Sequence, residues 1–309
     1  RESNMEEALI VAQQVFIMFI LMFVGFCFSK ANMIREEAIP VLNSLVVYAA
    51  GPAVMIQSFL INFSMEKLKE MGIAFLLSVV LMGTAALIGM LFFPKKDAIA
   101  RFAVVFNNCG FIGIPLVQAV LGEGAVFYLT ILMAVWNLFS WTYGITILAE
   151  DTSWVSLKKV LTNPAVVSIA IGLVFFLTPL KMPSVFQTSL KLVGNMNTPL
   201  AMMVLGYSLT KADFAEVLHQ PRLWKIAAFR LIIIPLVTLT LFCFVPAQFN
   251  EIRMTMMIAA ATPTGATLSI FLGMLKKKSS SATLIISLTT ICSLVTIPAV
   301  LALASLLWT

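Results

Sequence analysis

The stretch FNNCGFIGIP, Phe106–Pro115, lies in the middle of an apolar segment that is long enough to span a bilayer. Its two adjacent asparagines, two glycines and proline all weaken a helix. Lipid supplies no water to the backbone N–H and C=O groups that such a break leaves unpaired. An interruption at this depth therefore predicts that protein or a water-filled cavity covers it.

The composition around this stretch is that of a membrane protein. The 309 residues are 61% hydrophobic and 11% charged, whereas soluble domains average roughly 45–50% apolar and about 25% charged residues. The sequence lacks the alternation of a membrane β-barrel, so we expect an all-α integral membrane protein. The net charge of +6 comes from lysines and arginines scattered in short loops, a pattern that encodes topology and indicates no nucleic-acid partner.

Hydropathy and helix breaks predict ten transmembrane helices. The predicted spans are residues 8–28, 38–60, 70–93, 99–121, 125–149, 164–180, 185–209, 223–245, 252–275 and 281–307. Lysines and arginines concentrate in the loops that follow odd-numbered spans, such as LKKKSSS after the ninth. The positive-inside rule places these loops in the cytoplasm. We therefore expect a multi-pass protein of the cell inner (plasma) membrane with both termini extracytoplasmic, and no secretory signal peptide.

The two halves of the chain share landmarks. Three residue pairs are separated by one interval, 246 − 94 = 152 residues: Pro94 and Pro246, Arg101 and Arg253, and Gly113 and Gly265. Five spans per copy is an odd number, so the second copy must be inverted in the membrane, which is a feature of transporters. We predict a first five-helix repeat at residues 5–150, counted from Met5, and a second, inverted repeat at residues 151–309.

Span nine is interrupted in the same way as span four, by ATPTGA at residues 261–266. We expect the second half-helices to begin near Ile114–Pro115 and near Thr264–Ala266, because proline suits the first turn of a helix. The free N–H groups and dipoles of two such ends would attract a carboxylate or a similar anion at the midplane. The candidate substrate-binding residues are Asn108, Gly113, Pro115, Asn137, Thr262, Pro263, Thr264 and Gly265. Structural kinks and helix–helix hydrogen bonds are the alternative explanation.

Other kinds of site find no support in the sequence. The cysteines form no CxxC pair, and the one histidine, His219, lies in a polar loop, so we expect no metal and no cofactor. No Asp or Glu lies deep inside a span, which argues against a dedicated proton relay. Arg230, the one basic residue well inside a span, is expected to snorkel or to tether a neighbouring helix rather than to touch substrate.

Several segments resemble the auxin efflux carrier family, which includes the plant PIN-FORMED proteins and many bacterial members. The segments are NNCGFIGIPLVQAVLGEGAV and WNLFSW in spans four and five, GFCFSKANMIREEAIPVLNSLVVYAAGPAVM in spans one and two, and AAATPTGATLSIFLGM in span nine. The resemblance implies broken crossover helices in spans four and nine, a scaffold part of spans one, two, six and seven, and a transport part of spans three to five and eight to ten. It also implies a homodimer and an elevator-like motion. Asn108, Asn137 and Pro263 match positions of the family's site.

These features together predict a secondary carrier that exports small organic anions, carboxylates first among them, by alternating access. Its partners would be the anion and membrane lipid. Two alternatives stay open: a sodium-coupled symporter of the bile-acid type, whose ion would bind unwound carbonyls, and a membrane receptor that does not transport. Uptake that vanishes without sodium would indicate the first, and binding without flux the second. An intramembrane hydrolase would need a nucleophile with a base or a metal, so we expect no enzyme and no catalytic residues.

Overall fold

The computed structural model describes residues 2–151, 153, 157–277 and 279–308, which are helical with no β-strand in these ranges. The α-helices are α1 (Glu2–Lys30), α2 (Ala38–Leu45), α3 (Gly51–Ser58), α4 (Met65–Phe92), α5 (Ala98–Val105), α6 (Ile114–Leu121), α7 (Val126–Phe139), α8 (Ile145–Ala149), α9 (Leu157–Leu161), α10 (Pro164–Leu177), α11 (Ser184–Gly194), α12 (Asn197–Leu209), α13 (Phe214–Leu218), α14 (Pro221–Ala228), α15 (Ile234–Phe242), α16 (Asn250–Ala261), α17 (Thr267–Met274) and α18 (Ser280–Trp308). Short π-helical turns join some of them: η1 (Val46–Ala50), η2 (Cys109–Gly113), η4 (Ser140–Gly144) and η6 (Phe229–Ile233). The predicted all-α class is confirmed.

Six helical stretches of the described chain are long and apolar enough to cross a membrane: Ile10–Lys30, Ala38–Ser58, Met65–Phe92, Glu123–Ala149, Pro221–Phe242 and Ser280–Trp308. They correspond to predicted spans one, two, three, five, eight and ten. The remaining predicted spans are short or interrupted helices, namely α5 with α6, α10, α11 with α12, and α16 with α17. Because an uninterrupted crossing takes about 20 apolar residues, a total of ten crossings stays a prediction.

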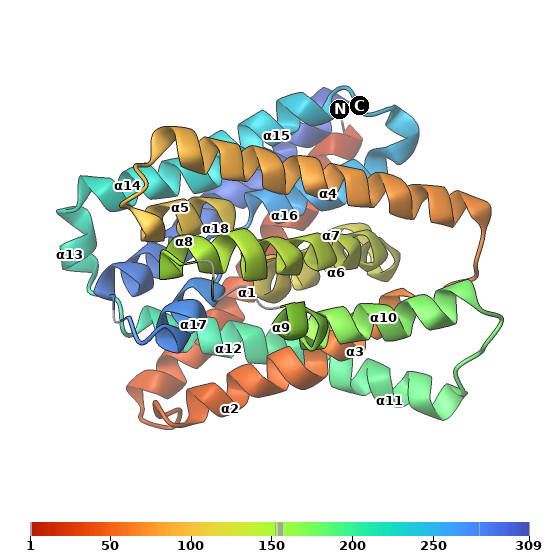
Figure 1. Ribbon diagram of the computed structural model, residues 1–309, viewed down its shortest axis with the longest axis horizontal. Coiled ribbons are helices and arrows are strands. Elements are labelled where there is room, and N and C mark those ends of the chain that lie inside the picture. The colour runs from red at the N-terminus through yellow and green to blue at the C-terminus, as the bar shows by residue number, and fades with distance from the viewer. Residues whose placement is uncertain (1, 152, 154–156, 278, 309) are drawn as a thin grey trace.

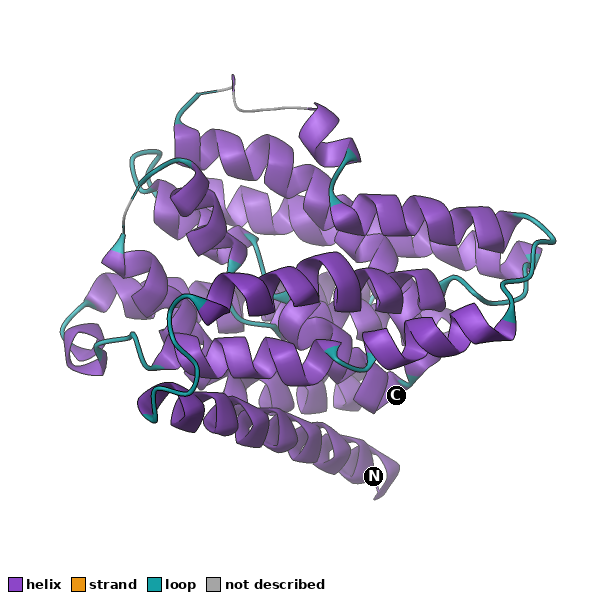
Figure 2. Ribbon diagram, turned by 90° about the horizontal axis from the view of Figure 1, so that it is seen from below, coloured by secondary structure: helices purple, strands orange, loops and turns teal. Residues whose placement is uncertain are grey.

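Helix α1 packs along α12, and two glycines bring their backbones into contact. A Cβ atom at Gly206 of α12 would lie 1.9 Å from the carbonyl oxygen of Met22, and one at Gly25 of α1 would lie 2.4 Å from that of Met203. Small residues at such positions allow close packing of membrane helices, where dispersion replaces the hydrophobic effect as the driving force. The beginning of α1 and the end of α18 lie side by side in both views (Figures 1 and 2).

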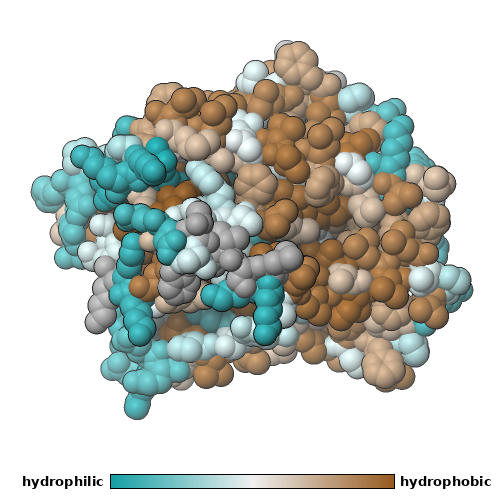
Figure 3. Space-filling view, viewed as in Figure 1, coloured by the Kyte–Doolittle hydropathy of each residue, from teal (hydrophilic) through white to brown (hydrophobic). Residues whose placement is uncertain are grey.

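The surface exposes many large apolar side chains, which is unfavourable in water. Large side chains such as Leu91, Val295 and Phe244 are 69%, 71% and 85% exposed. In Figure 3, hydrophilic residues gather at the end of the molecule where α13 lies in Figure 1, and apolar atoms cover most of the remaining face. Lipid is the solvent that such a surface suits.

Two arginines make the same contact in the two halves of the chain. Arg101 donates from Nε to the carbonyl of Phe93 at 2.9 Å, and Arg253 donates from Nη1 to the carbonyl of Val245 at 3.1 Å. Each acceptor lies eight residues before its arginine, so both pairs keep the interval found in the sequence. The two arginines thus make similar local contacts at the same interval, and the repeat itself stays a prediction.

The glycine landmark does not mark equivalent places. Gly113 lies in the π turn η2, whereas Gly265 lies in the non-helical link between α16 and α17. The reason is that α16 has 12 residues and α5 has 8, so the second helix breaks later than the first. Gly113 and Gly265 therefore share the interval without sharing a local structure.

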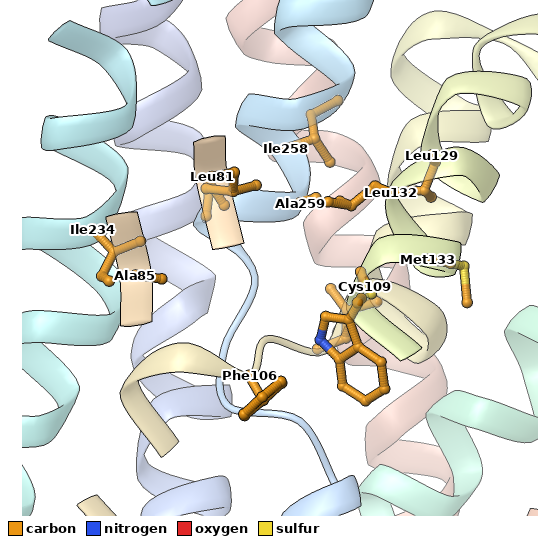
Figure 4. Packing of buried hydrophobic residues seen from close by; sticks show 14 of the residues in the cluster. Leu81, Ala85, Phe106, Cys109, Leu129, Leu132, Met133, Ile234, Ile258 and Ala259 are labelled. Carbon is orange, nitrogen blue, oxygen red and sulfur yellow. The ribbon is translucent and has the colours of Figure 1, made fainter. Parts of the chain in front are cut away.

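The densest part of the interior surrounds α16, whose residues from Ile252 to Ala261 are all buried. Figure 4 shows Ala259 on this helix, Leu132 on α7, and Phe106 and Cys109 along the link from α5 to α6. Apolar side chains of α16 and α7 therefore pack beside the two helix breaks.

Candidate functional site

The two interrupted helices complete each other's backbone hydrogen bonds. The N–H of Asn108 donates to the carbonyl of Pro263 at 2.8 Å, and the N–H of Gly265 donates to the carbonyl of Phe106 at 2.9 Å. Only glycine fits this crossing, because a Cβ at Gly265 would lie 2.7 Å from the carbonyl oxygen of Asn107. These two bonds pair backbone groups that the breaks would otherwise leave without a partner at this depth.

Side chains fasten the same crossing, where Asn107 and Thr264 form an isolated antiparallel bridge. Asn107 donates from Nδ2 to the carbonyl of Ala259 at 2.8 Å, and Thr264 donates from Oγ1 to the carbonyl of Ala103 at 3.0 Å. A polar side chain in each break therefore donates to a carbonyl in the last turn of the helix that precedes the other break. These bonds tie α5 and α16 into one unit.

A cavity of about 350 Å³ lies beside the crossing, a volume within the range of small-molecule sites. Its wall is formed by η1 and α3, by the link between α5 and η2, and by η2 itself. Further wall residues come from α7 and η4, from the starts of α10 and α12, and from α17. Among the described residues, those lining it include no carboxylate, amine, guanidinium or imidazole. An ion bound there would not meet a charged side chain.

Four buried polar atoms on the cavity wall have no hydrogen-bond partner among the described residues: Asn107 Oδ1, Asn108 Nδ2, Trp136 Nε1 and Asn197 Nδ2. The orientation of the Asn107 amide is fixed, because its Nδ2 donates to Ala259. Three of these atoms are N–H donors and one is a carbonyl acceptor, and each is itself buried within a residue that lines the cavity. A buried polar group left unpaired costs about 1–3 kcal/mol, so this set points to a polar ligand or water.

Two helix N-termini also face the cavity. The helix formed by η2 and α6 begins at Cys109, α17 begins at Thr267, and both of these residues line the wall. Within the described chain, neither N-cap residue, Asn108 or Ala266, provides a side-chain cap. Uncapped N–H groups and the positive end of the helix dipole favour an anion here.

Three of the four π turns in the described chain contribute residues to the wall. They supply Val46–Tyr48 from η1, Cys109–Phe111 from η2, and Ser140 with Trp141 from η4. A π turn widens the helix by one residue and is frequent at functional sites. The cavity is therefore bounded by irregular helices on three sides.

The structure brings only part of the predicted site to the cavity wall. Asn108 and Asn137 line it, although Asn137 also donates from Nδ2 to the carbonyl of Met133 in its own helix at 2.8 Å. The remaining candidates lie next to the described wall and do not form it: Gly113, Pro115, Thr262, Pro263, Thr264 and Gly265. Thr262 and Thr264 are fully buried and hydrogen-bonded at the crossing.

Sequence reasoning missed Asn197, Trp136 and Trp141 as wall residues. Asn197 had a usable signal, because it is an amide at the centre of predicted span seven, where an unpaired polar group is costly. The tryptophans had none, since an aromatic residue in a membrane helix faces lipid as readily as protein.

A family model described as membrane transport protein matches residues 10–301 of the chain. The chain belongs to this family. It is the family of the auxin efflux carriers, so the resemblance found in spans one, two, four, five and nine is confirmed. The chain is also 29% identical over 250 residues to the uncharacterized transporter MJ1031 of Methanocaldococcus jannaschii, covering 74% of this chain and 77% of the relative. The family member described here is therefore a membrane transport protein.

Proposed function

We propose that the chain is a secondary carrier that exports small organic anions, carboxylates above all, by alternating access around the cavity at the crossing. The observation that carries the proposal is the set of polar groups found at the wall of this cavity. Two helices without a side-chain N-cap begin at this wall, and Asn108, Trp136 and Asn197, each with a buried N–H that has no partner among the described residues, line it, while no charged side chain does so in the described chain. Donors of this kind bind a carboxylate through charge-assisted hydrogen bonds.

The rest of the wall suits an apolar body of modest size. Phe111, Trp136, Trp141 and Phe271 all line the cavity, and aromatic rings provide large contact areas to flat or aliphatic groups. The free carbonyl oxygen of Asn107 offers one acceptor to a donor on the substrate. We therefore expect a monoanion with one charged end.

The architecture that we propose has ten spans in two inverted repeats, residues 5–150 and 151–309, with both termini outside the inner (plasma) membrane. Support comes from the equivalent contacts of Arg101 and Arg253 and from the proximity of the two chain ends (Figure 1). A scaffold of spans one, two, six and seven would carry the homodimer contact.

The cavity lies between the proposed scaffold and the proposed transport part. Its wall takes residues from spans two, six and seven of the proposed scaffold and from spans four, five and nine of the proposed transport part. Asn163 and Met274 of the wall adjoin the loops expected in the cytoplasm. Under this topology the cavity faces inward, and sliding of the transport part would carry it outward.

The test is a thermal-shift titration of the purified protein with small carboxylates, because a bound ligand raises the melting temperature by mass action. We expect a saturable rise that Asn197→Ala reduces and that the matched control Asn195→Ala, an exposed amide two residues away, leaves unchanged. Carboxylates that stabilise both variants equally would place the site elsewhere. Flux of the bound anion in sealed proteoliposomes then separates a carrier from a receptor.

A further inference from the structure

Arg230 lies behind the crossing, outside the described cavity wall, and is 1% exposed. It belongs to the π turn η6 and donates to three backbone carbonyls. Its Nε reaches Thr262 at 3.1 Å and its Nη1 reaches Val104 at 3.0 Å, while its Nη2 donates to Ala260. Arg230 thus tethers neighbouring helices, one of the two roles expected from the sequence.

The three acceptors share one property, which is that they end the first halves of the two broken helices. Val104 lies in the last turn of α5, Ala260 lies in the last turn of α16, and Thr262 follows α16. Carbonyl groups at a helix C-terminus lack intrahelical partners and carry the negative end of the dipole. One guanidinium therefore neutralises two negative helix ends at once.

The charge of Arg230 has no acidic partner in the described part of the chain, where the salt bridges involve other residues. A buried charge is costly unless hydrogen bonds and opposite charge compensate it. The carbonyl cluster and the two helix dipoles are the compensation that the structure supplies. The relation is reciprocal, because the guanidinium also supplies hydrogen bonds to three carbonyls at the helix ends.

Clusters of this kind are where other transporters hold a coupling ion, since unwound carbonyls and half-helix C-termini coordinate Na⁺. Here each of the nearby carbonyls already accepts a hydrogen bond. Those of Ala103 and Ala259 accept from Thr264 and Asn107, and those of Phe106 and Pro263 accept from the crossing backbone. The carbonyls that face Arg230 would become free only without its side chain.

We infer that Arg230 is a resident cation that fills the carbonyl cluster of the crossing, so that the carrier works without a coupling Na⁺. It is a positioning residue, because it holds the two first half-helices and thereby the N-termini that face the cavity. The part of the inference that concerns transport without Na⁺ rests on the proposed function. The cation site itself is defined by the contacts of Arg230 alone.

The first arm of the test needs no substrate. The melting temperature of the purified protein is measured in NaCl and in choline chloride of equal concentration, choline being too large for a carbonyl cluster. We expect the same value in both salts. A higher value in Na⁺ would overturn the inference, since an ion that binds only the folded state must stabilise it.

The second arm compares Arg230→Lys, which keeps the charge, with Arg230→Met, which keeps much of the volume and loses the charge. We expect the lysine protein to melt higher than the methionine protein, and both to melt below the wild type. A methionine protein as stable as the lysine protein, or more so, would show that the cluster needs no cation.

Chemical rescue completes the design. Guanidinium chloride, at concentrations too low to denature, should raise the melting temperature of Arg230→Ala and leave that of the wild type unchanged. Arg222→Ala is the matched control, because Arg222 pairs with Asp97 near the surface and its loss should not create a guanidinium site. If guanidinium has the same effect on both variants, Arg230 fills no such site. Failure of carboxylates to bind would overturn the proposed function and leave these results standing.

Discussion

Asn107 and Asn108 are neighbours with different tasks. Asn107 uses its amide N–H to hold the carbonyl of Ala259 and leaves its side-chain oxygen without a partner among the described residues, whereas the amide N–H of Asn108 is itself buried there without a partner. Hydropathy treats the two residues alike, because both are amides at the same depth. The family resemblance singled out Asn108, which lines the cavity, and its role in binding stays a prediction.

Asn108→Ala should weaken anion binding. Removing one hydrogen bond to a charged group costs on the order of 1.5–3 kcal/mol, roughly tenfold to a hundredfold in affinity. Asn137→Ala should have a smaller effect, because its amide already donates within α7. The dissociation constants of the best carboxylate, measured for both variants and the wild type, check this. A folded Asn108→Ala protein with wild-type affinity would contradict the proposed site.

Among the elements, the π turns follow a rule that the sequence carries. Three of the four in the described chain end two residues before a proline, namely Pro52, Pro115 and Pro235. Proline has no N–H to donate and its ring clashes with the carbonyl four residues earlier, and a widened turn relieves that clash. The prolines therefore predict where these helices become irregular.

The same turns explain why the wall was predicted only in part. Each π turn inserts one extra residue, which rotates the following face by roughly 100° relative to a regular helix. A helical wheel drawn from α7 through η4 therefore misplaces the residues that follow the turn, which are those of α8. The breaks themselves were predictable from their Gly and Pro residues. The sequence did not show which residues would form the crossing rather than the cavity wall, and Thr262–Gly265 belong to the crossing.

Gly206→Ala should separate α1 from α12. Its Cβ would lie 1.9 Å from a backbone oxygen of α1, which a rotamer change cannot relieve, and overpacking of this kind costs about 1–3 kcal/mol or more. The control is Gly83→Ala in α4, where a Cβ meets no described atom within 4 Å. That change should be neutral, or stabilise by roughly 0.5–1 kcal/mol, since alanine favours helix. Melting temperatures of both variants decide the matter, and equal losses would rule out close packing as the cause.

For the whole molecule, the sequence predicted the class, the family and the positions of the two breaks. These follow from composition and from residues that no membrane helix would carry without a reason. It did not predict the contacts that join the halves, such as Asn107 with Ala259, because they lie 152 residues apart. Arg101 and Arg253 make similar contacts at the shared interval, whereas Gly113 and Gly265 lie in different local structures, so the repeat stays a prediction.

The proposed topology predicts which cysteines an impermeant reagent can reach. In a background with the four native cysteines replaced, Lys277→Cys should not react from outside intact cells, because its loop is expected in the cytoplasm. Lys181→Cys, in an exposed connection on the opposite side, should react. Labelling of the first and not the second would invert the orientation of the chain.

Transport should follow the membrane potential. An anion that crosses without a compensating ion moves one net charge, worth about 2.3 kcal/mol per 100 mV, so an inside-negative potential drives export. Flux in proteoliposomes with a clamped potential and an imposed pH gradient is the measurement, with a substrate that stays fully ionised across the pH range. We expect flux to track the potential and to ignore the pH gradient. Stoichiometric proton movement at zero potential would contradict this uniport model.

The crossing also sets an order of events during synthesis. Asn108 bonds to Pro263, which the ribosome adds 263 − 108 = 155 residues later, roughly 8–30 s at about 5–20 residues per second. Throughout that delay the first break has emerged without its partner, and its backbone groups cannot rest in hydrocarbon. We therefore expect the segment that holds the first break to wait at the membrane surface or inside the insertion machinery until the second half arrives.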